Sequence, residues 1–464
     1  MAALQRTYSP IDGSLVATRE LADGAAVERT LAAAQAGTAA WTESPLEERT
    51  AVVRRMVESM VGRADVIAAE LAAQMGRPVR DGPKEIRGGY AERALAMAAL
   101  APAALADIDA GGEAGTRRMI RRRPVGVVLV LAPWNYPFLT AVNAVVPAIL
   151  AGSSVVLKHS DQTPLAAERI AEAFRDAGLP DGVLQVLHMS HDTAADVIRD
   201  PRVGYVHFTG SVEGGRAVKR AAVDRFIGVG LELGGKDPAY VRADADLEQA
   251  VAGLVDGAMF NAGQSCCGVE RIYVARELFD PFVERFQELT RAYRLGDPRD
   301  PETTLGPMVR TSNAELAREH VRAAVARGAV PLIDPKSFPA AAEGTPYMAP
   351  QVLINVRQSM RVMQEETFGP VVGIVPVTDD AEAVHMMNDS RYGLTASVWT
   401  RDLDAVDRLA SRLATGTCYA NGCDYLDPLL PWSGVKDSGH GLSLSQLGFE
   451  PFTRTLSLHL RRPG

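Results

Sequence analysis

The sequence predicts an α/β protein built around a doubly wound parallel sheet. Short apolar runs alternate with amphipathic helical segments from Val125 to Leu233. The run from Val125 to Leu131 (VGVVLVL) is apolar throughout, which is typical of parallel strands that are buried on both faces. A second alternating region begins at Asp246. We therefore expect two α/β lobes, with one strand left over near the C-terminus.

Composition and charge argue against nucleic-acid binding and membrane proteins. The chain has 464 residues, 47% of them hydrophobic and 23% charged, as in a globular protein with a large core. The formal net charge of −8 gives no reason to expect nucleic acid or an anionic membrane as a partner. The longest uncharged apolar stretch, 94–106, contains Pro102 and is shorter than the roughly 20 residues of a membrane helix. The N-terminal MAALQRTYSPIDGSLVA shows no hydrophobic targeting segment.

The chain has only four cysteines, Cys266, Cys267, Cys418 and Cys423. Their spacing does not resemble a zinc site, because no CxxC pair is matched by a second pair or by clustered histidines. So few cysteines in a long chain are typical of free thiols in a reducing compartment. We expect a cytoplasmic protein without a metal site.

In the first quarter of the chain, apolar residues at helical spacing predict helices between Ala25 and Leu71. Residues 77–89 are rich in glycine, proline and charge, and a loop is expected there. An alanine-rich helix is expected at 91–106, ending or breaking near Pro102. The basic run 116–124 (TRRMIRRRP) either contacts phosphate or is a solvated strand whose arginines pair with acidic residues of this or a neighbouring subunit. The acidity of the chain favours the second interpretation.

The doubly wound region begins after Pro124. Thr163 at the N-cap, Pro164 as first residue and Gly178 at the end predict one helix. The turn Gly210 to Arg216 (GSVEGGR) follows a strand and leads into a helix from Arg216. The expected strands are 125–131, 153–158, 183–187, 203–208 and 226–233, and the expected helices are 139–150, 164–178 and 191–199.

The second region repeats the alternation. Residues 422–441 are rich in glycine, proline and aspartate, so a long loop is expected. Thr453 to Leu460 alternates like an edge strand. The other expected helices are 246–260, 280–293, 311–327, 381–388 and 404–413, and the other expected strands are 272–275, 371–377, 396–400 and 416–421.

A thiol and a carboxylate form the first candidate for chemistry. Cys266 lies in the glycine-flanked turn FNAGQSCCG, which can hold a thiol at the mouth of a cleft. Glu232 ends an apolar strand at a Gly-Gly turn. Such a pair suits a covalent mechanism in which the thiol attacks and the carboxylate activates water. The alternative is a buried, inert cysteine and a solvated glutamate.

A glycine-rich turn is the second candidate. The chain has no GxGxxG, the usual dinucleotide fingerprint. Gly210-Ser211 with Gly214-Gly215 nevertheless forms a glycine-rich junction from strand to helix. Backbone N–H groups at such a helix start can bind a pyrophosphate.

Five motifs together resemble the aldehyde dehydrogenase superfamily. They are PWNYP (133–137), FTGSVEGG (208–215), LELGGK (231–236), FNAGQSC (260–266) and EETFGP (365–370), in this order. The likeness extends from about Pro10 to Leu460. It implies an NAD(P)-binding domain (1–111 and 125–234), a catalytic domain (235–440) and a β arm (112–124 and 449–464). The arm would complete a neighbour's sheet in a homodimer or homotetramer.

The resemblance also implies roles for individual residues. Cys266 would be the nucleophile that adds to an aldehyde, and the Asn135 amide with the backbone N–H of Cys266 would stabilise the oxyanion. Glu232 would be the general base that hydrolyses the thioester, which implies release of a free acid. A cysteine-dependent esterase and a non-catalytic member of the family remain alternatives.

The cofactor implied is NAD, with NADP possible. Asp161, three residues after Lys158, would disfavour a 2′-phosphate, but a shorter Asp in place of the commoner Glu leaves room for NADP. Lys158 would contact the adenosine ribose, Ser211 the pyrophosphate, and Glu366 the nicotinamide ribose, with Phe368 near the ring. The implied cofactor residues are Pro133, Trp134, Lys158, Asp161, Gly210, Ser211, Gly215, Glu366 and Phe368.

The sequence predicts a small-molecule aldehyde as the substrate but does not identify which aldehyde. Asp424, Asp427 and Tyr425 either prefer a cationic tail or are loop-capping aspartates beside a packing aromatic. Cys267 is either a bystander or a partner of Cys266 in reversible oxidation. The expected pocket residues are Tyr136, Cys267, Asn421, Asp424, Tyr425 and Trp432.

Overall fold

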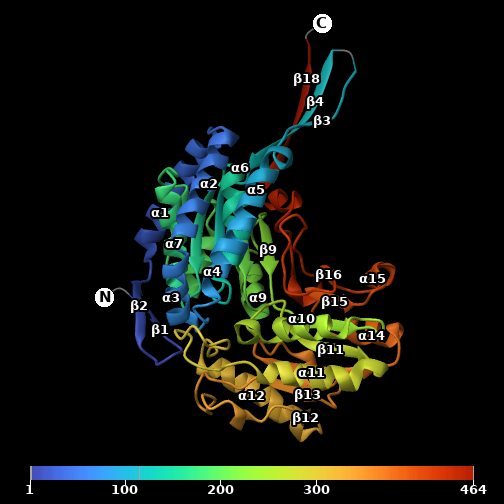
Figure 1. The fold of residues 1–464 in the computed structure, drawn as a ribbon. Helices are drawn as coiled ribbons and strands as arrows, with labels where there is room; N and C mark the ends of the chain where they lie inside the picture. The colour runs from blue at the N-terminus through green and yellow to red at the C-terminus, as the bar shows by residue number, and fades with distance from the viewer. Residues whose placement is uncertain (1–2, 114, 463–464) are drawn as a thin grey trace.

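The computed structural model describes residues 3–113 and 115–462. Two α/β lobes lie one above the other in Figure 1, and a long β arm projects from the upper lobe. Both lobes contain a largely parallel sheet with helices on its faces, which confirms the predicted fold class.

The upper sheet has six strands in the order β17-β9-β8-β5-β6-β7. All neighbours are parallel except β17, which runs antiparallel to β9. The strand order reverses between β5 and β8, which makes this edge the expected ligand crevice. The strands are β5 (Val127–Ala132), β6 (Ser154–His159), β7 (Leu184–Val186), β8 (Val203–Thr209), β9 (Gly228–Glu232) and β17 (Gly439–His440).

The surroundings of strand β5 explain why its sequence is apolar throughout. Val128 and Val130 belong to a core that includes α2, α5, α6 and α7, whereas Val127 and Leu129 belong to a second core with α1, α8 and α9. The strand is therefore buried on both faces, as predicted. The helices are α1 (Gly24–Thr42), α2 (Leu46–Gly62), α3 (Ala64–Met75), α5 (Ala91–Ala104), α6 (Pro137–Ala151), α7 (Pro164–Asp176), α8 (His191–Arg199) and α9 (Val212–Ala221).

The lower sheet has seven strands in the order β12-β13-β14-β11-β10-β15-β16. Only the β12–β13 pair is antiparallel. The strands are β10 (Asp237–Val241), β11 (Val269–Ala275), β12 (Val330–Pro331), β13 (Gln351–Ile354), β14 (Val371–Val377), β15 (Thr395–Trp399) and β16 (Thr417–Ala420). The helices are α10 (Leu247–Met259), α11 (Phe279–Arg291), α12 (Thr311–Ala326), α13 (Arg361–Gln364), α14 (Asp380–Asn388) and α15 (Leu403–Ala410).

The arm is a three-stranded antiparallel sheet of β18 (Thr453–Arg461), β4 (Thr116–Pro124) and β3 (Ile108–Asp109). The basic run is therefore a strand, with most of its side chains exposed or half-buried. One of its arginines, Arg121, forms an ion pair with Asp107 at 3.0 Å. This agrees with a solvated strand paired with acidic residues.

Several predicted elements were wrong or missing. Residues 77–89 are largely helical, as α4 (Gly82–Lys84) and the π-helix η1 (Glu85–Tyr90), because buried contacts compensate for the glycines. Helix α9 begins at Val212 and not at Arg216, and the Thr163 side chain makes no capping hydrogen bond. The prediction omitted β3, β10, β12, β13, β17 and the hairpin β1 (Leu4–Tyr8) and β2 (Leu15–Glu20).

The remaining helical turns are short and connect larger elements. They are η2 (Phe260–Gly263), η3 (Arg276–Leu278), η4 (Pro335–Ser337), η5 (Lys436–Ser438) and η6 (Leu447–Phe452). Within residues 3–113 and 115–462, no helix is both long and apolar enough to cross a membrane.

The domain boundaries stay a prediction. Strand β3 belongs to the arm sheet although the arm was predicted to begin at 112. Strand β17 pairs with the upper sheet although it lies within 235–440. Both differences arise because a sheet is completed by whichever strand lies beside it in space.

Candidate active site

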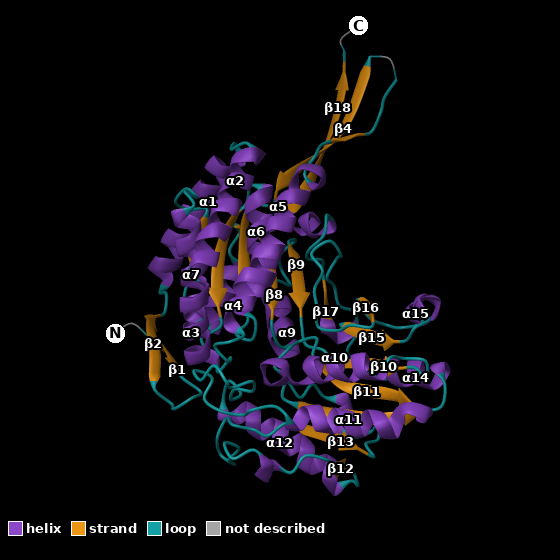
Figure 2. Ribbon diagram, in the orientation of Figure 1, coloured by secondary structure: helices purple, strands orange, loops and turns teal. Residues whose placement is uncertain are grey.

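The candidate site lies where the two lobes meet. Strands β5, β8 and β9 of the upper sheet end there, and β10, β11 and β14 of the lower sheet begin there. Figure 2 shows β9 running down toward the lower lobe. The turns that follow the upper strands therefore contact the turns that precede the lower ones.

Cys266 lies on a tight turn between η2 and β11 and is partly exposed. Asn261 in this turn has φ +53° and Gly263 has φ +66°. A Cβ on Gly263 would lie 2.2 Å from the carbonyl oxygen of Gly369, so the position requires glycine. The Gln264 side chain stabilises the turn by donating to the carbonyl of Asn261 at 3.0 Å.

Asn135 is buried in the turn after β5 and faces the Cys266 turn. Its Nδ2 donates to the backbone carbonyl of Gln264 at 3.2 Å. Arg77 donates to the carbonyl of Asn135 and forms a buried ion pair with Glu85. The Arg77 guanidinium also lies 4.5 Å from the ring centre of Tyr136. The position of the Asn135 turn therefore depends on a buried charge pair.

Glu85 connects this network to helix α6. Its Oε1 accepts hydrogen bonds from the backbone N–H groups of Phe138 at 2.9 Å and Leu139 at 3.2 Å, in the first turn of α6. A carboxylate is favourable there because these N–H groups have no partner within the helix. The composition of 77–89 predicts a loop and gives no signal for Arg77 or Glu85.

Glu232 ends β9 and is hydrogen-bonded at both carboxylate oxygens. Thr209 donates to Oε2 at 3.2 Å and the Ser443 hydroxyl donates to Oε1. Nε2 of His207 lies 3.7 Å from Oε1, but burial lowers the pKa of His207 and keeps its ring neutral at pH 7. The sequence analysis did not identify Ser443.

The Glu232 and Cys266 turns touch directly. A Cβ on Gly235 would lie 2.4 Å from the carbonyl oxygen of Cys266. The Gly-Gly turn after Glu232 therefore permits the close approach of the two segments. The structure brings Cys266, Asn135 and Glu232 into one site.

Cys267 is buried beside the predicted nucleophile. Its Sγ donates to Oδ1 of Asp424 at 2.9 Å, and the Ser265 hydroxyl donates to the same oxygen at 2.9 Å. A hydrogen bond with Cys266, and then burial, hold the pKa of the Cys267 thiol well above its usual range. Cys267 therefore stays protonated at neutral pH, and Asp424 is occupied by internal donors.

Two other predicted pocket residues have structural partners. The Asn421 amide accepts from the backbone N–H of Thr400 and donates to its carbonyl, both at 2.9 Å. Trp432 is 4% exposed and lies in the core of the upper lobe. Both side chains therefore have partners within the protein, and their place at a substrate pocket stays a prediction.

Tyr425 and Asp427 lie in the same loop. Tyr425 is exposed and its hydroxyl donates to Glu92 at 2.7 Å, and this hydrogen bond raises the pKa of Tyr425 to about 12. Asp427 accepts from the backbone N–H of Leu429 at 2.8 Å. Asp427 is thus a loop-capping residue, which is the second of the two interpretations.

A cavity of about 590 Å³ lies at the ends of β5, β6 and β8. Ser211 begins α9 at this cavity, and its hydroxyl accepts from the N–H of Gly214 at 3.1 Å. The position, at the reversal of strand order and at a helix start, fits a dinucleotide. Six predicted cofactor residues line the cavity: Pro133, Trp134, Lys158, Asp161, Gly210 and Ser211.

Gly215 has a packing role instead. A Cβ there would lie 2.7 Å from the Leu233 side chain, so this glycine permits close packing of α9 against the end of β9.

Glu366 and Phe368 precede β14 and lie on the side of the lower lobe. Oε1 of Glu366 accepts from the N–H of Gly235 at 3.1 Å, and the Phe368 ring packs edge-on against Trp134 at 5.5 Å. Burial, and then the nearby Glu270 charge, raise the pKa of Glu366 to about 8. Glu270 also accepts from the N–H of Phe368 at 2.9 Å.

Arg93, on α5, is a buried cation that the sequence analysis did not identify. It is 6% exposed and donates to the carbonyl of Leu139 at 2.8 Å and the amide oxygen of Asn143 at 3.4 Å. Burial lowers its pKa, while the nearby groups Cys267, Glu232, Glu85 and Cys266 oppose that shift. Among the described residues, no carboxylate forms an ion pair with it. The sequence signal was a lone arginine in an alanine-rich helix.

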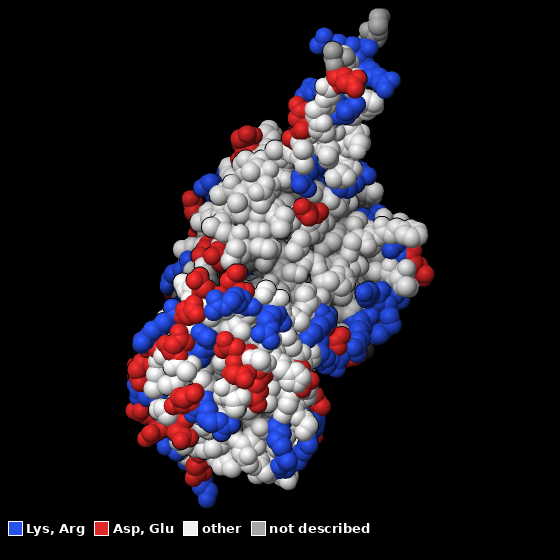
Figure 3. Space-filling view, turned by 90° about the vertical axis from the view of Figure 1, so that its right-hand side faces the viewer, with Lys and Arg blue, Asp and Glu red and all other residues white. Residues whose placement is uncertain are grey.

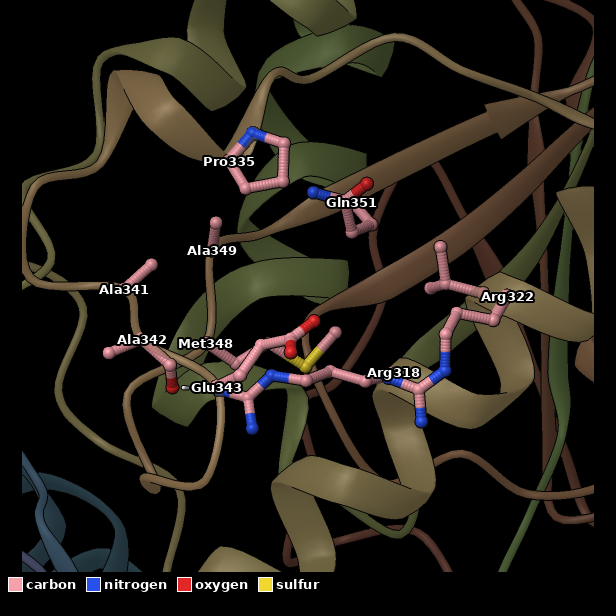
Figure 4. A pocket seen from close by; sticks show the side chains of 10 residues that line it. Arg318, Arg322, Pro335, Ala341, Ala342, Glu343, Met348, Ala349 and Gln351 are labelled. Atoms are coloured by element: carbon pink, nitrogen blue, oxygen red, sulfur yellow. Dashed lines mark hydrogen bonds between the residues drawn. The ribbon is translucent and has the colours of Figure 1, made fainter.

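Figure 4 shows a separate hollow in the lower lobe, between α12 and the loop before β13. Arg318 at this hollow donates to the carbonyls of Ala342, Thr345 and Tyr347. Its charge therefore supports the loop. None of the three candidate catalytic residues lines this hollow. In the part of the chain that the structure describes, no three His, Cys, Asp or Glu side chains cluster to hold a metal ion.

Comparison with known proteins decides the family. The sequence profile of the aldehyde dehydrogenase family matches residues 2–458. The chain belongs to the aldehyde dehydrogenase family. A succinate semialdehyde dehydrogenase of Escherichia coli (strain K12), named as using NAD(P)+, is 34% identical over 452 residues, which cover 96% of each chain.

Solved structures agree with this family. An NADP-dependent enzyme of E. coli has a TM-score of 0.95 and 28% identity, covering 99% of this chain and 95% of its own. An NAD-dependent aldehyde dehydrogenase from Sinorhizobium meliloti has a TM-score of 0.93 and 33% identity, covering 100% and 92%. The protein with the present sequence is therefore an oxidoreductase that converts an aldehyde to a carboxylic acid with NAD or NADP.

Proposed function

We propose that Cys266, Asn135 and Glu232 perform this oxidation in two stages. The observation that carries the proposal is their convergence where the β5, β9 and Cys266 turns meet. The Cys266 thiolate attacks the carbonyl carbon of the aldehyde and forms a thiohemiacetal. The Asn135 amide and the Cys266 backbone N–H stabilise the resulting oxyanion, and one such donor contributes roughly 3–4 kcal/mol.

When bound, NAD(P)+ supplies the hydride acceptor. As the carbonyl of the thiohemiacetal reforms, its C–H bond breaks and a thioester remains on Cys266. Glu232 then takes a proton from water, the water oxygen adds to the thioester carbon, and the C–S bond breaks to release the acid. Thr209 and Ser443 hold the Glu232 carboxylate in place.

A pre-steady-state experiment tests these roles. Glu232→Gln should give a burst of reduced nicotinamide close to one per site, followed by slow turnover, because the thioester forms but is not hydrolysed. Cys266→Ala should give no burst while the cofactor still binds. Steady turnover of Glu232→Gln at the wild-type rate would remove Glu232 as the base, and turnover of a simple ester without cofactor would favour the esterase alternative.

We infer that the substrate carries an anionic group in addition to the aldehyde. Arg93 supports this class because it is a buried cation of α5 whose charge is favoured electrostatically by Cys267, Glu232, Glu85 and Cys266. The E. coli relative at 34% identity is named for succinate semialdehyde, an aldehyde with a carboxylate. A cationic tail is disfavoured because Asp424 and Asp427 have internal donors.

Kinetics with a matched pair of aldehydes test the substrate class. Arg93→Met should lower kcat/KM for succinate semialdehyde by about 10- to 100-fold, since a hydrogen bond to a charged group contributes roughly 1.5–3 kcal/mol. Butanal, which has no carboxylate, should be affected far less. Arg93→Lys should restore part of the activity, and Arg87→Met, at an exposed ion pair, is the control. An equal loss on both aldehydes would assign Arg93 a structural role.

We propose that the protein forms a homodimer or homotetramer through its arm. Strand β18 is an outer strand of the arm sheet, so one row of its backbone groups has no partner there. Figure 3 shows a broad uncharged surface next to the arm. Exposed apolar residues of the arm and neighbouring segments are Ile108, Leu429, Leu430, Leu447, Leu456 and Leu460.

A cytoplasmic location is also proposed. It is supported by four cysteines without a disulfide among the described residues and by a mechanism that needs a reduced thiol. Cell fractionation followed by thiol labelling of Cys266 tests it.

A further inference from the structure

The cofactor cavity contains a charge that comes from the other lobe. Arg310 immediately precedes α12 in the lower lobe, yet it lines the cavity together with Lys158, Ser160 and Asp161. Its Nη2 lies 3.1 Å from Oδ1 of Asp161, and its Nε donates to the Gln162 amide oxygen at 3.0 Å. This end of the cavity therefore holds two cations and one carboxylate.

The Asp161 backbone is anchored, whereas its side chain is open to solvent. Thr7 of strand β1 donates to the Asp161 carbonyl at 2.6 Å. The side chains of Asp161 and Arg310 are 62% and 48% exposed, respectively. Ion pairs this exposed are weak. The guanidinium can therefore exchange the carboxylate for a stronger partner, such as a phosphate, which it can bind with two parallel hydrogen bonds.

We propose that Arg310 and Asp161 select the cofactor at the ribose 2′ position. This inference rests on the proposed use of NAD(P) by this site, with the adenosine ribose beside Lys158 as the family resemblance implies. With NADP, Arg310 turns from Asp161 to the 2′-phosphate, which Lys158 and Ser160 also contact. With NAD, the ion pair stays closed and Asp161 accepts a hydrogen bond from the 2′-hydroxyl. The site thus takes both cofactors, although the charge of Asp161 alone would disfavour the phosphate.

Equilibrium binding without aldehyde tests the proposal separately from catalysis. Isothermal titration calorimetry would give Kd for NAD+, NADP+, 2′,5′-ADP and 5′-AMP with the wild type, Arg310→Met, Asp161→Asn and the double variant. Arg310→Met should weaken NADP+ and 2′,5′-ADP at least tenfold and change NAD+ and 5′-AMP less than twofold. Arg299→Met, an exposed arginine paired with Asp297 outside the cavity, is the control and should change none.

The double variant distinguishes two effects of Arg310, which are shielding of the Asp161 charge and direct contact with the 2′-phosphate. Asp161→Asn should strengthen NADP+ binding more in the Arg310→Met background than in the wild type, because Asp161 is then unshielded. Affinity of the wild type for 2′,5′-ADP should also fall more steeply with salt than its affinity for 5′-AMP. Equal weakening of NAD+ and NADP+ by Arg310→Met, or no wild-type binding of 2′,5′-ADP, would overturn the proposal. Binding of NAD+ by every variant shows that the site is folded even if the catalytic roles fail.

Discussion

Glu366 illustrates how one residue's surroundings set its chemistry. Its carboxyl group accepts one hydrogen bond, from the N–H of Gly235, while the Glu270 carboxylate lies nearby. Burial and this like charge raise the pKa of Glu366 to about 8. At pH 7 the group is therefore mostly neutral before the cofactor binds. Accepting hydrogen bonds from two ribose hydroxyls favours the ionised form of a glutamate.

Cofactor binding should consequently depend on pH. If Glu366 contacts the nicotinamide ribose as predicted, the ribose hydroxyls favour its charged form, and its pKa should be lower in the complex than in the free enzyme. Affinity for NAD+ should rise as pH increases toward 8 and level off above it. Calorimetric titrations at pH 6.5, 7.5 and 9 check this, and Glu366→Gln should show a flatter profile. A wild-type affinity that falls over this range would contradict the role of Glu366.

Arg93 and Arg310 show that the neighbours of a side chain can lie far from it in the sequence. Both are arginines whose neighbours are distant in the sequence. Arg310 and Asp161 are 149 positions apart, and Arg93 and Asn143 are 50 positions apart. The roles proposed for them toward the substrate and the cofactor depend on the groups that the fold places next to them.

At the scale of elements, the π-helix η1 supports the Asn135 turn. Glu85 begins η1 and binds both Arg77 and the first turn of α6. Each side chain of the ion pair is 2% exposed. Removing one partner from such a pair leaves a buried charge without compensation. The element that looked like a loop therefore positions the proposed oxyanion donor.

Replacement of Arg77 should destabilise both the fold and the site. Arg77→Met should lower the free energy of unfolding by roughly 3–5 kcal/mol, because Glu85 stays buried and unpaired. Arg77→Met with Glu85→Gln should recover part of the loss. Arg87→Met, at an exposed ion pair, should change stability by less than about 1 kcal/mol. Thermal unfolding of the wild type and the three variants checks the expected order of stability. Equal melting temperatures for Arg77→Met and Arg87→Met would refute the prediction.

At the scale of the molecule, charge is unevenly distributed. In Figure 3, charged side chains gather on the lower lobe and at the tip of the arm, and a broad area between them is nearly free of charge. An uncharged face beside an extended sheet edge is typical of an interface between subunits.

Charges introduced on the arm should weaken assembly. Leu456→Lys with Leu460→Lys should lower the mass measured by light scattering toward that of the monomer, because two buried ammonium groups oppose association. Leu403→Lys, on α15, exchanges a leucine that is also exposed but lies away from the arm, and it should leave the mass unchanged. A monomeric wild type, or an unchanged mass for the double variant, would exclude the arm as the interface.

Much of the fold was predictable because its signals are local. Apolar runs placed most strands of the upper sheet to within a few residues, and helix α8 matched its prediction at both ends. Strands β10 and β13 were missed because short apolar segments next to turns lack a clear period. The partners of Trp432 and Asn421 were not predictable, because composition cannot show which partners a side chain finds.

The sequence by itself determined the α/β class, the order of the five motifs, and hence the family with Cys266, Asn135 and Glu232 as its candidate chemistry. These depend on residues that are close together in the chain. Only the tertiary structure decided that Arg77 and Glu85 support Asn135, that Arg93 is buried against Leu139 and Asn143, and that Arg310 faces Asp161. The physical reason is that a buried or paired charge takes its energy from neighbours in space, and the two lobes contribute those neighbours from distant parts of the chain.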